Sequence, residues 1–399
     1  MKKLVLILCL FIATADVGAV GLESRQFTPY FNMRVGQGAY LPNQGAFFTG
    51  ANMNLGVGLL SKITDKHVLF ALYNLDFRGQ AFQFPNTQEF DSKSQAHLFS
   101  FEYRWNVGDR WRVRPSVAFG KTYTQTAAAE VWGHGLYDDK SAGLQLAGDY
   151  TFPIRQKDAV LTPMISRYVI RFPNYSDILR EFRGENANTG LAGGLKDQVL
   201  LEYSLGFKYA PWRAKLRFNT VDFKSERVVQ ASATYGTDKQ ADSNVILEGG
   251  MDAKLWILET SPQIRFVTHK SNQNFLLFQS ATDATPAFAG NYYGYKEVSL
   301  GLPVFLNMTK NWAASGELDL QKRTYDSRHP RDSQNQFVSG RQSDNMVTLS
   351  AGLRKRMNDV SAFTLTYSVT TARSNNKFER YLPSSYTGQG LVLAYQLTY

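Results

Sequence analysis

The sequence predicts an all-β fold: a membrane-spanning, antiparallel, up-and-down β-barrel of about sixteen strands, within a range of about 14 to 18. Three observations support this prediction: period-two alternation of apolar residues, strictly alternating short and long connections, and aromatic residues beside the short connections. The predicted strands are 25–35, 48–60, 67–79, 95–106, 110–123, 141–153, 158–172, 198–209, 213–225, 243–257, 262–272, 292–306, 311–325, 344–357, 360–373 and 386–399.

The N-terminus has the pattern of a secretory signal peptide. Lys2 and Lys3 precede the apolar run 4–13, and small residues follow, with a processing site ending at Ala15 or Ala19. An N-terminal membrane anchor is the weaker alternative, because about 20 apolar residues are needed for a helical span. The sequence therefore predicts export.

This prediction divides the chain into a signal peptide, residues 1–19, and one barrel domain, residues 20–399. Cys9, the one cysteine, lies inside the signal peptide, so the mature chain is expected to contain no thiol and no disulfide. Its net charge stays strongly positive. A basic, secreted, β-rich chain indicates attraction to anionic lipid head groups or anionic solutes, and we expect no nucleic-acid partner.

Composition supports strands with one wet face. Hydrophobic residues make up 43% of the chain, yet the mean hydropathy is −0.31. Successive strand side chains point to opposite faces, so apolar and polar residues can alternate. In segment 386–399 the residues Leu391, Leu393, Tyr395 and Leu397 alternate with small or polar ones. Segments 360–373 and 344–357 alternate in the same way, and Asn358-Asp359 between them is a hairpin-turn signal.

The connections alternate between short ones of two to six residues and long ones of twelve to twenty-five. A spanning barrel has short periplasmic turns and longer extracellular loops. Tryptophan fits the same scheme, because its amphipathic ring is favoured at the membrane interface. Five tryptophans lie within a few residues of a short connection: Trp105, Trp111, Trp212, Trp256 and Trp312.

These features resemble a Gram-negative outer-membrane β-barrel. The terminal strand 386–399, which ends in Leu-x-Tyr-x-Leu-x-Tyr at Tyr399, resembles the signal that the outer-membrane assembly machinery recognises. The resemblance covers the chain after the signal peptide and extends to porins through the strand number, but to no specific porin family. It implies lipid and lipopolysaccharide as surroundings, leaves a homo-oligomer open, and places the protein in the bacterial outer membrane.

The resemblance to porins also implies a loop that narrows the lumen. In general porins the loop after the fifth strand folds inward, and the corresponding loop here is 124–140. Its acidic residues Glu130, Asp138 and Asp139 would then face a basic wall. An exposed surface loop is an equal alternative, and loop 173–197 is a rival constriction.

A sixteen-stranded barrel is too wide for side chains to fill, so its polar face is expected to line an aqueous lumen. On the fourth to ninth segments that face is assigned the basic residues Arg104, Arg112, Arg114, Arg167, Arg171, Lys208, Arg213, Lys215 and Arg217. The tenth to thirteenth segments offer Glu248, Asp252, Glu297, Glu317 and Asp319, with Lys254, Arg265 and Arg323 among them. We expect a transverse field with a modest anion preference, or a wall whose neighbouring charges cancel.

The function predicted from the sequence is passive diffusion of small hydrophilic solutes, with no cofactor and no metal. A barrel closed by its loops, with a binding, adhesion or structural role, is a second class. An outer-membrane enzyme is a third and weaker one. The five histidines, His67, His97, His134, His269 and His329, lie in separate segments or loops, and no local motif joins them to a nucleophile.

Overall fold

The computed structural model describes residues 27–43, 48–79, 88–89, 93–125, 131–176, 193–278, 286–378 and 384–399. The predicted signal peptide lies outside this range. Among the described residues no helix is long and apolar enough to cross a membrane.

Sixteen antiparallel strands form the wall, as the sequence predicts. The first eight are β1 (Phe27–Pro42), β2 (Phe48–Thr64), β3 (His67–Gly79), β5 (Lys93–Asn106), β6 (Trp111–Gln125), β7 (Asp139–Ile154), β8 (Lys157–Arg171) and β9 (Gln198–Tyr209). The others are β10 (Trp212–Val229), β11 (Tyr235–Met251), β14 (Gln263–Ser271), β17 (Tyr295–Asn307), β18 (Trp312–Tyr325), β19 (Ser343–Arg356), β20 (Ser361–Ser374) and β21 (Tyr386–Thr398).

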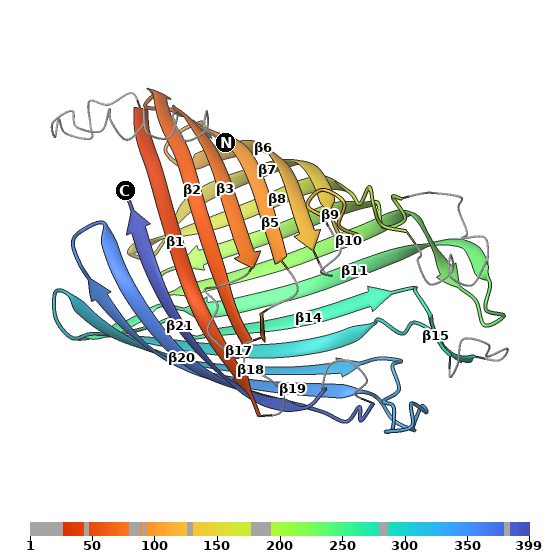
Figure 1. Cartoon of the computed structure of the whole chain (residues 1–399). Helices are drawn as coiled ribbons and strands as arrows, with labels where there is room; N and C mark the ends of the chain where they lie inside the picture. The colour runs from red at the N-terminus through yellow and green to blue at the C-terminus, as the bar shows by residue number, and fades with distance from the viewer. Residues whose placement is uncertain are drawn as a thin grey trace.

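Each wall strand pairs with the next one along the chain, and β1 pairs with β21 to close the barrel. The closing register runs from Asn32 opposite Thr398 to Pro42 opposite Gly388. Figure 1 shows β1 in red beside β21 in dark blue, with every strand inclined to the barrel axis. Closure leaves no unpaired strand edge in the wall, which is what hydrocarbon surroundings demand of a sheet.

Five shorter strands accompany the wall. The strands β12 (Ala253–Leu255) and β13 (Leu258–Thr260) continue β11 and β14 toward the short turn at 256–257 without a change of register. In the long loops, β15 (Phe275–Leu277) pairs with β16 (Ala287–Ala289), and β4 (Gln88–Glu89) pairs with β2.

The hairpin of β10 and β11 extends past the neighbouring wall. The sequence predicts a long loop over 226–242, but both strands continue there and close in the turn 230–234. The register shifts twice along the way, between Asp222 and Arg227 and between Arg227 and Val229. The strand β9 ends its pairing with β10 at Gln198 opposite Phe223, so the last turn of this hairpin stands clear of β9.

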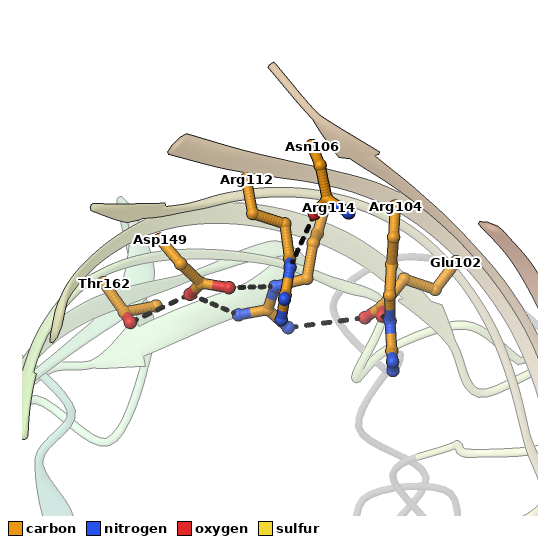
Figure 2. A network of polar contacts seen from close by, with 7 residues as sticks. All are labelled: Glu102, Arg104, Asn106, Arg112, Arg114, Asp149 and Thr162. Carbon is orange, nitrogen blue, oxygen red and sulfur yellow. Dashed lines mark hydrogen bonds and ion pairs between the residues drawn. The ribbon is translucent and has the colours of Figure 1, made fainter. Parts of the chain in front are cut away.

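The two faces of the wall follow from the pairing register, because directly opposed residues lie on the same face. Figure 2 shows Glu102, Arg114 and Asp149 on the concave face. The register transfers that assignment from strand to strand around the barrel, and the alternation stays in phase through the closing pair β1–β21.

The outward face is apolar and bears a tryptophan rim at the short turns, as predicted. Leu144 is 65% exposed and Leu393 53% exposed, although both are aliphatic. Such exposure suits a surface that faces lipid. The rim tryptophans lie at strand ends beside short turns or, for Trp256, within one: Trp105, Trp111, Trp212, Trp256 and Trp312.

Candidate pore lining

Six inward side chains of alternating charge form a continuous ion-pair ladder across six wall strands, from β9 to β18. The members of this ion-pair ladder, in order, are Glu202, Arg217, Glu248, Arg265, Glu297 and Arg323. The successive N···O distances are 3.8, 3.4, 3.4, 3.6 and 2.6 Å. Every interior member has an opposite charge on both sides, so the ladder is locally neutral.

The tightest part of the ladder is its end on β17 and β18. Glu297 is only 5% exposed, and Arg323 lies directly opposite it. The guanidinium of Arg323 donates through Nε and Nη2 to Oε2 of Glu297, at 2.9 and 2.6 Å. Gln321 donates to the same oxygen at 2.6 Å. A carboxylate with several charge-assisted donors tolerates burial that would otherwise disfavour it.

A second network lies on β5, β6 and β7 (Figure 2). Glu102 contacts Arg104 at 2.5 Å and Arg114 at 3.5 Å. Arg114 also pairs with Asp149 at 3.0 Å, and the hydroxyl of Thr162 on β8 donates to Asp149 at 3.0 Å. The side chains project from the concave face of the wall, so this network extends the charged lining toward the ion-pair ladder.

The sequence missed the acidic members of both networks on β5, β7 and β9. Glu102, Asp149 and Glu202 each lie on the inward-facing side of their strands. The alternation of polar and apolar residues along each strand was the signal that could have identified them. Because these carboxylates alternate with arginines, the basic and acidic walls predicted from the sequence are not separate. The charges of the described lining are interleaved, so neighbouring ion pairs offset part of the expected transverse field, which stays a prediction.

Most predicted lining residues do face inward by register. They are Arg104, Arg112, Arg114, Arg213, Lys215, Arg217, Glu248, Asp252, Glu317 and Asp319. Arg112 forms no ion pair with a carboxylate of the described residues, and its Nε donates to the side-chain oxygen of Asn106 at 3.0 Å. Arg213 forms an ion pair with Asp252, which also accepts a hydrogen bond from Ser261.

Arg167 and Arg171 are corrections, because the register places both on the outward face of β8. Arg167 lies between Leu144 and Leu201, and Arg171 lies opposite Lys140. The inward positions of β8 belong to residues such as Thr162, whose hydroxyl reaches Asp149. Neither arginine lines the lumen.

The predicted constriction acids separate into three cases. Glu130 lies outside the described residues, as does most of loop 173–197. Asp138 is 5% exposed, and its Oδ1 accepts hydrogen bonds from the backbone N–H and the hydroxyl of Thr124. The Asp138 carboxylate therefore joins the two ends of the β6–β7 connection through Thr124. Asp139 faces inward at the loop end of β7, opposite Thr122.

A recess of about 720 Å³ lies beside the ion-pair ladder. Lys215, Gln263, Ser299 and Asp319 contribute polar side chains to it, together with three ladder members. No carboxylate of the described residues forms an ion pair with Lys215. The recess therefore presents to the lumen the Lys215 ammonium outside the ion pairs, the Asp319 carboxylate and several neutral hydrogen-bonding groups.

Histidine contributes to the lining only through His269. Its Nδ1 is 2.7 Å from Oδ1 of Asn244, and Asn244 donates to Asn219 at 2.6 Å. The ring stacks on Tyr295, with centroids 4.9 Å apart. The half-buried ring of His269 is thus held by Asn244 and Tyr295, and it pairs with no nucleophilic side chain of the described residues. Among the described residues no group of three His, Cys, Asp or Glu is arranged to hold a metal ion.

Comparison with known proteins gives distant likenesses among solved structures alone. No family model and no curated protein matches the chain. Among solved structures, a bacterial polysaccharide outer membrane secretin shares 10% identity with a TM-score of 0.46, over 92% of this chain and 98% of that one. The outer-membrane expressed OmpT of Vibrio cholerae shares 10% identity with a TM-score of 0.46, over 95% and 99%.

The outer membrane protein OpdK of Pseudomonas aeruginosa shares 7% identity with a TM-score of 0.44, over 93% and 99%. At such identities and TM-scores these likenesses carry no argument about this chain. The closed wall, the apolar outward face, the tryptophan rim and the charged lining carry the assignment. The protein is therefore a sixteen-stranded β-barrel of the outer-membrane type.

Proposed function

We propose that the barrel is a passive channel for small hydrophilic solutes across the bacterial outer membrane. The ion-pair ladder carries this proposal. A sixteen-stranded barrel leaves a lumen that side chains do not fill, and its lining here consists of charged groups that water can solvate. Such a wall suits polar solutes and disfavours apolar ones.

Interleaved charges support weak ion selectivity. A ring of one sign of charge selects ions in a narrow pore, whereas neighbouring pairs cancel over a short distance. The modest anion preference expected from the sequence now depends on inward cations that lie outside the two networks. Lys215 in the recess and Arg354 on β19 are such cations.

Cysteine accessibility during conductance recording tests the proposal. The predicted mature chain contains no thiol, so each introduced cysteine is the single reactive site. Ser299 on β17 faces the recess, and its neighbour Leu300 faces outward. In planar bilayers the refolded barrel should show open steps. A charged, water-soluble thiol reagent should lower the conductance of Ser299→Cys and leave Leu300→Cys unchanged.

Three outcomes contradict the proposal. An absence of open steps would favour a barrel closed by its loops, with a binding, adhesion or structural role. Equal effects of the reagent on both variants would mean that ions do not pass along the lining described here. Finally, neutral sugars of increasing size should permeate proteoliposomes up to a size limit. Exclusion of all of them would contradict passive diffusion of solutes through the barrel.

A further inference from the structure

Three cations lie directly opposite one another on the outward face of β6, β7 and β8. Lys121 pairs in register with Lys140, and Lys140 pairs with Arg171. We call these three residues the cation row. His97 on β5 continues the line on the other side, because it lies opposite Lys121. The row includes Arg171, which the sequence assigned to the lumen and which lies on the outward face opposite Lys140.

The cation row has no internal compensation. Like charges directly opposite in an antiparallel sheet repel and destabilise the pair. All three side chains are exposed, and no carboxylate of the described residues forms an ion pair with any of them. The outward positions of β5, β6, β7 and β8 also contain no Asp or Glu. An anion from outside the chain would remove the repulsion.

The height of the row on the wall indicates where that anion lies. Lys121, Lys140 and Arg171 are all within four residues of the long-loop ends of their strands. Other outward cations lie at the same end of the barrel: Lys93, Lys270, Lys296, Lys322 and Arg373. In outer-membrane barrels the long loops are extracellular, so this level corresponds to the head groups of the outer leaflet.

Below the row the outward face becomes apolar. Phe119 lies two residues deeper than Lys121 and is 54% exposed, and Leu144 lies four residues deeper than Lys140 and is 65% exposed. Arg167 lies four residues deeper than Arg171, and its long side chain can reach back toward the head groups. The patch therefore combines phosphate-binding cations with a surface for acyl chains.

We propose that the cation row binds the phosphate groups of a phosphorylated outer-leaflet glycolipid, whose acyl chains pack on Phe119 and Leu144. The ammonium of Lys121 also lies 4.4 Å from the ring centroid of Tyr123 on the same outward face. Arginine contributes a planar fork that matches phosphate oxygens, and lysine contributes a point charge. The inference rests on the proposed outer-membrane location and is independent of channel activity.

Binding of lipid A to the barrel in detergent, followed by native mass spectrometry, tests the proposal. The test variant combines Lys121→Gln, Lys140→Gln and Arg171→Gln. The matched control removes three cations at the short-turn end: Lys66→Gln, Lys157→Gln and Lys310→Gln. We expect wild type and control to bind lipid A alike and the test variant to bind about tenfold more weakly or worse.

Further arms distinguish the glycolipid from other sources of phosphate. Dephosphorylated lipid A, phosphatidylglycerol and inorganic phosphate should each bind wild type more weakly than lipid A does. Equal binding of lipid A to the test variant and the control would overturn the proposal. Equal binding of all the anionic probes, or of dephosphorylated lipid A, would overturn it as well.

Stability supplies a second readout that a merely structural role would not produce. In detergent without glycolipid, Lys140→Gln should unfold at a urea concentration equal to or above that of wild type, because the substitution relieves repulsion. Added lipid A should then stabilise wild type more than Lys140→Gln. A variant that is less stable without lipid, and equally stabilised by it, would contradict the proposal.

Discussion

Glu297 on β17 and Arg323 on β18 face each other directly, with Nη2 of the arginine 2.6 Å from a carboxylate oxygen that is almost fully buried. Arg265 reaches the other oxygen of Glu297 at 3.6 Å. One carboxylate therefore joins two guanidinium groups from two different strands. This arrangement makes Glu297 the residue on which the end of the ion-pair ladder depends.

We expect Glu297→Gln to lower the free energy of unfolding by about 1–3 kcal/mol, because two cations lose a shared anion in a partly dry site. Urea unfolding in lipid vesicles, followed by tryptophan fluorescence, measures the change. Glu317→Gln is the control, since Glu317 faces the same lumen but forms no ion pair with a described residue. Equal losses in the two variants would contradict the special role of Glu297.

Single substitutions in the ion-pair ladder should change ion selectivity in opposite directions. Arg265→Gln leaves its two acidic neighbours in excess and should move the reversal potential toward cations. Glu248→Gln removes an anion between two arginines and should move it toward anions. Lys355→Gln, on the outward face, should leave it unchanged. Shifts of the same sign for the two ladder variants would refute the interleaved lining.

Replacement of an outward arginine should stabilise the barrel. Arg167 lies four residues, or about 13 Å along the strand, below the loop end of β8. An arginine that faces lipid is costly at mid-depth and less so near the interface, so Arg167→Leu should gain about 1–2 kcal/mol in bilayers. Arg114→Leu should instead lose stability, because Asp149 would lose its ion-pair partner and Glu102 would keep only Arg104.

The measurement for this pair is the urea midpoint in vesicles of one lipid composition. If Arg167→Leu is destabilising while Arg114→Leu is neutral, the assignment of the two faces of the wall is wrong. The comparison thus tests the register of β6 and β8 as well as the energetics.

Asp138 should govern the order of the β6–β7 connection. Asp138→Ala removes the acceptor for the N–H and hydroxyl of Thr124, at a cost of about 1–2 kcal/mol. We expect faster proteolysis within 131–138, followed by gel electrophoresis of the folded barrel. Asp139→Ala, one residue away and directed into the lumen, should be cleaved at the wild-type rate. A faster rate for both would point to charge loss instead.

The sequence predicts the strands best where one face is small and polar. In β20 every inward position is small or polar, and in β21 all but Tyr386 and Val392 are, so parity separates the two faces. In β8 both parities contain apolar residues: Val160, Met164 and Ile170 inward, and Leu161, Ile165 and Val169 outward. Parity is then ambiguous, and the basic residues Arg167 and Arg171 were assigned to the wrong side.

Other features depend on information that a single sequence does not contain. Ion pairs such as Arg217–Glu248 join different strands, so they follow from the cross-strand register. The extension of β10 and β11 carries no apolar period, and the contacts of Arg227 and Val229 with the segment after β14 are hydrogen bonds between their backbone and the side chains of Gln273 and Asn274. Its residues 226–242 therefore have the composition of a loop while adopting strand pairing.

That extension also has a practical consequence. The hairpin ends in a turn at Ala233, which has a φ of 60°. The N–H of Ala233 donates a hydrogen bond to the carbonyl of Gln230 and closes the turn. Backbone pairing from β10 to β11 holds this turn beyond the wall, at its long-loop end, as a preformed element. A short peptide epitope inserted at Ser232 would be displayed to antibodies on intact cells, while the wall strands and their closing register remain untouched.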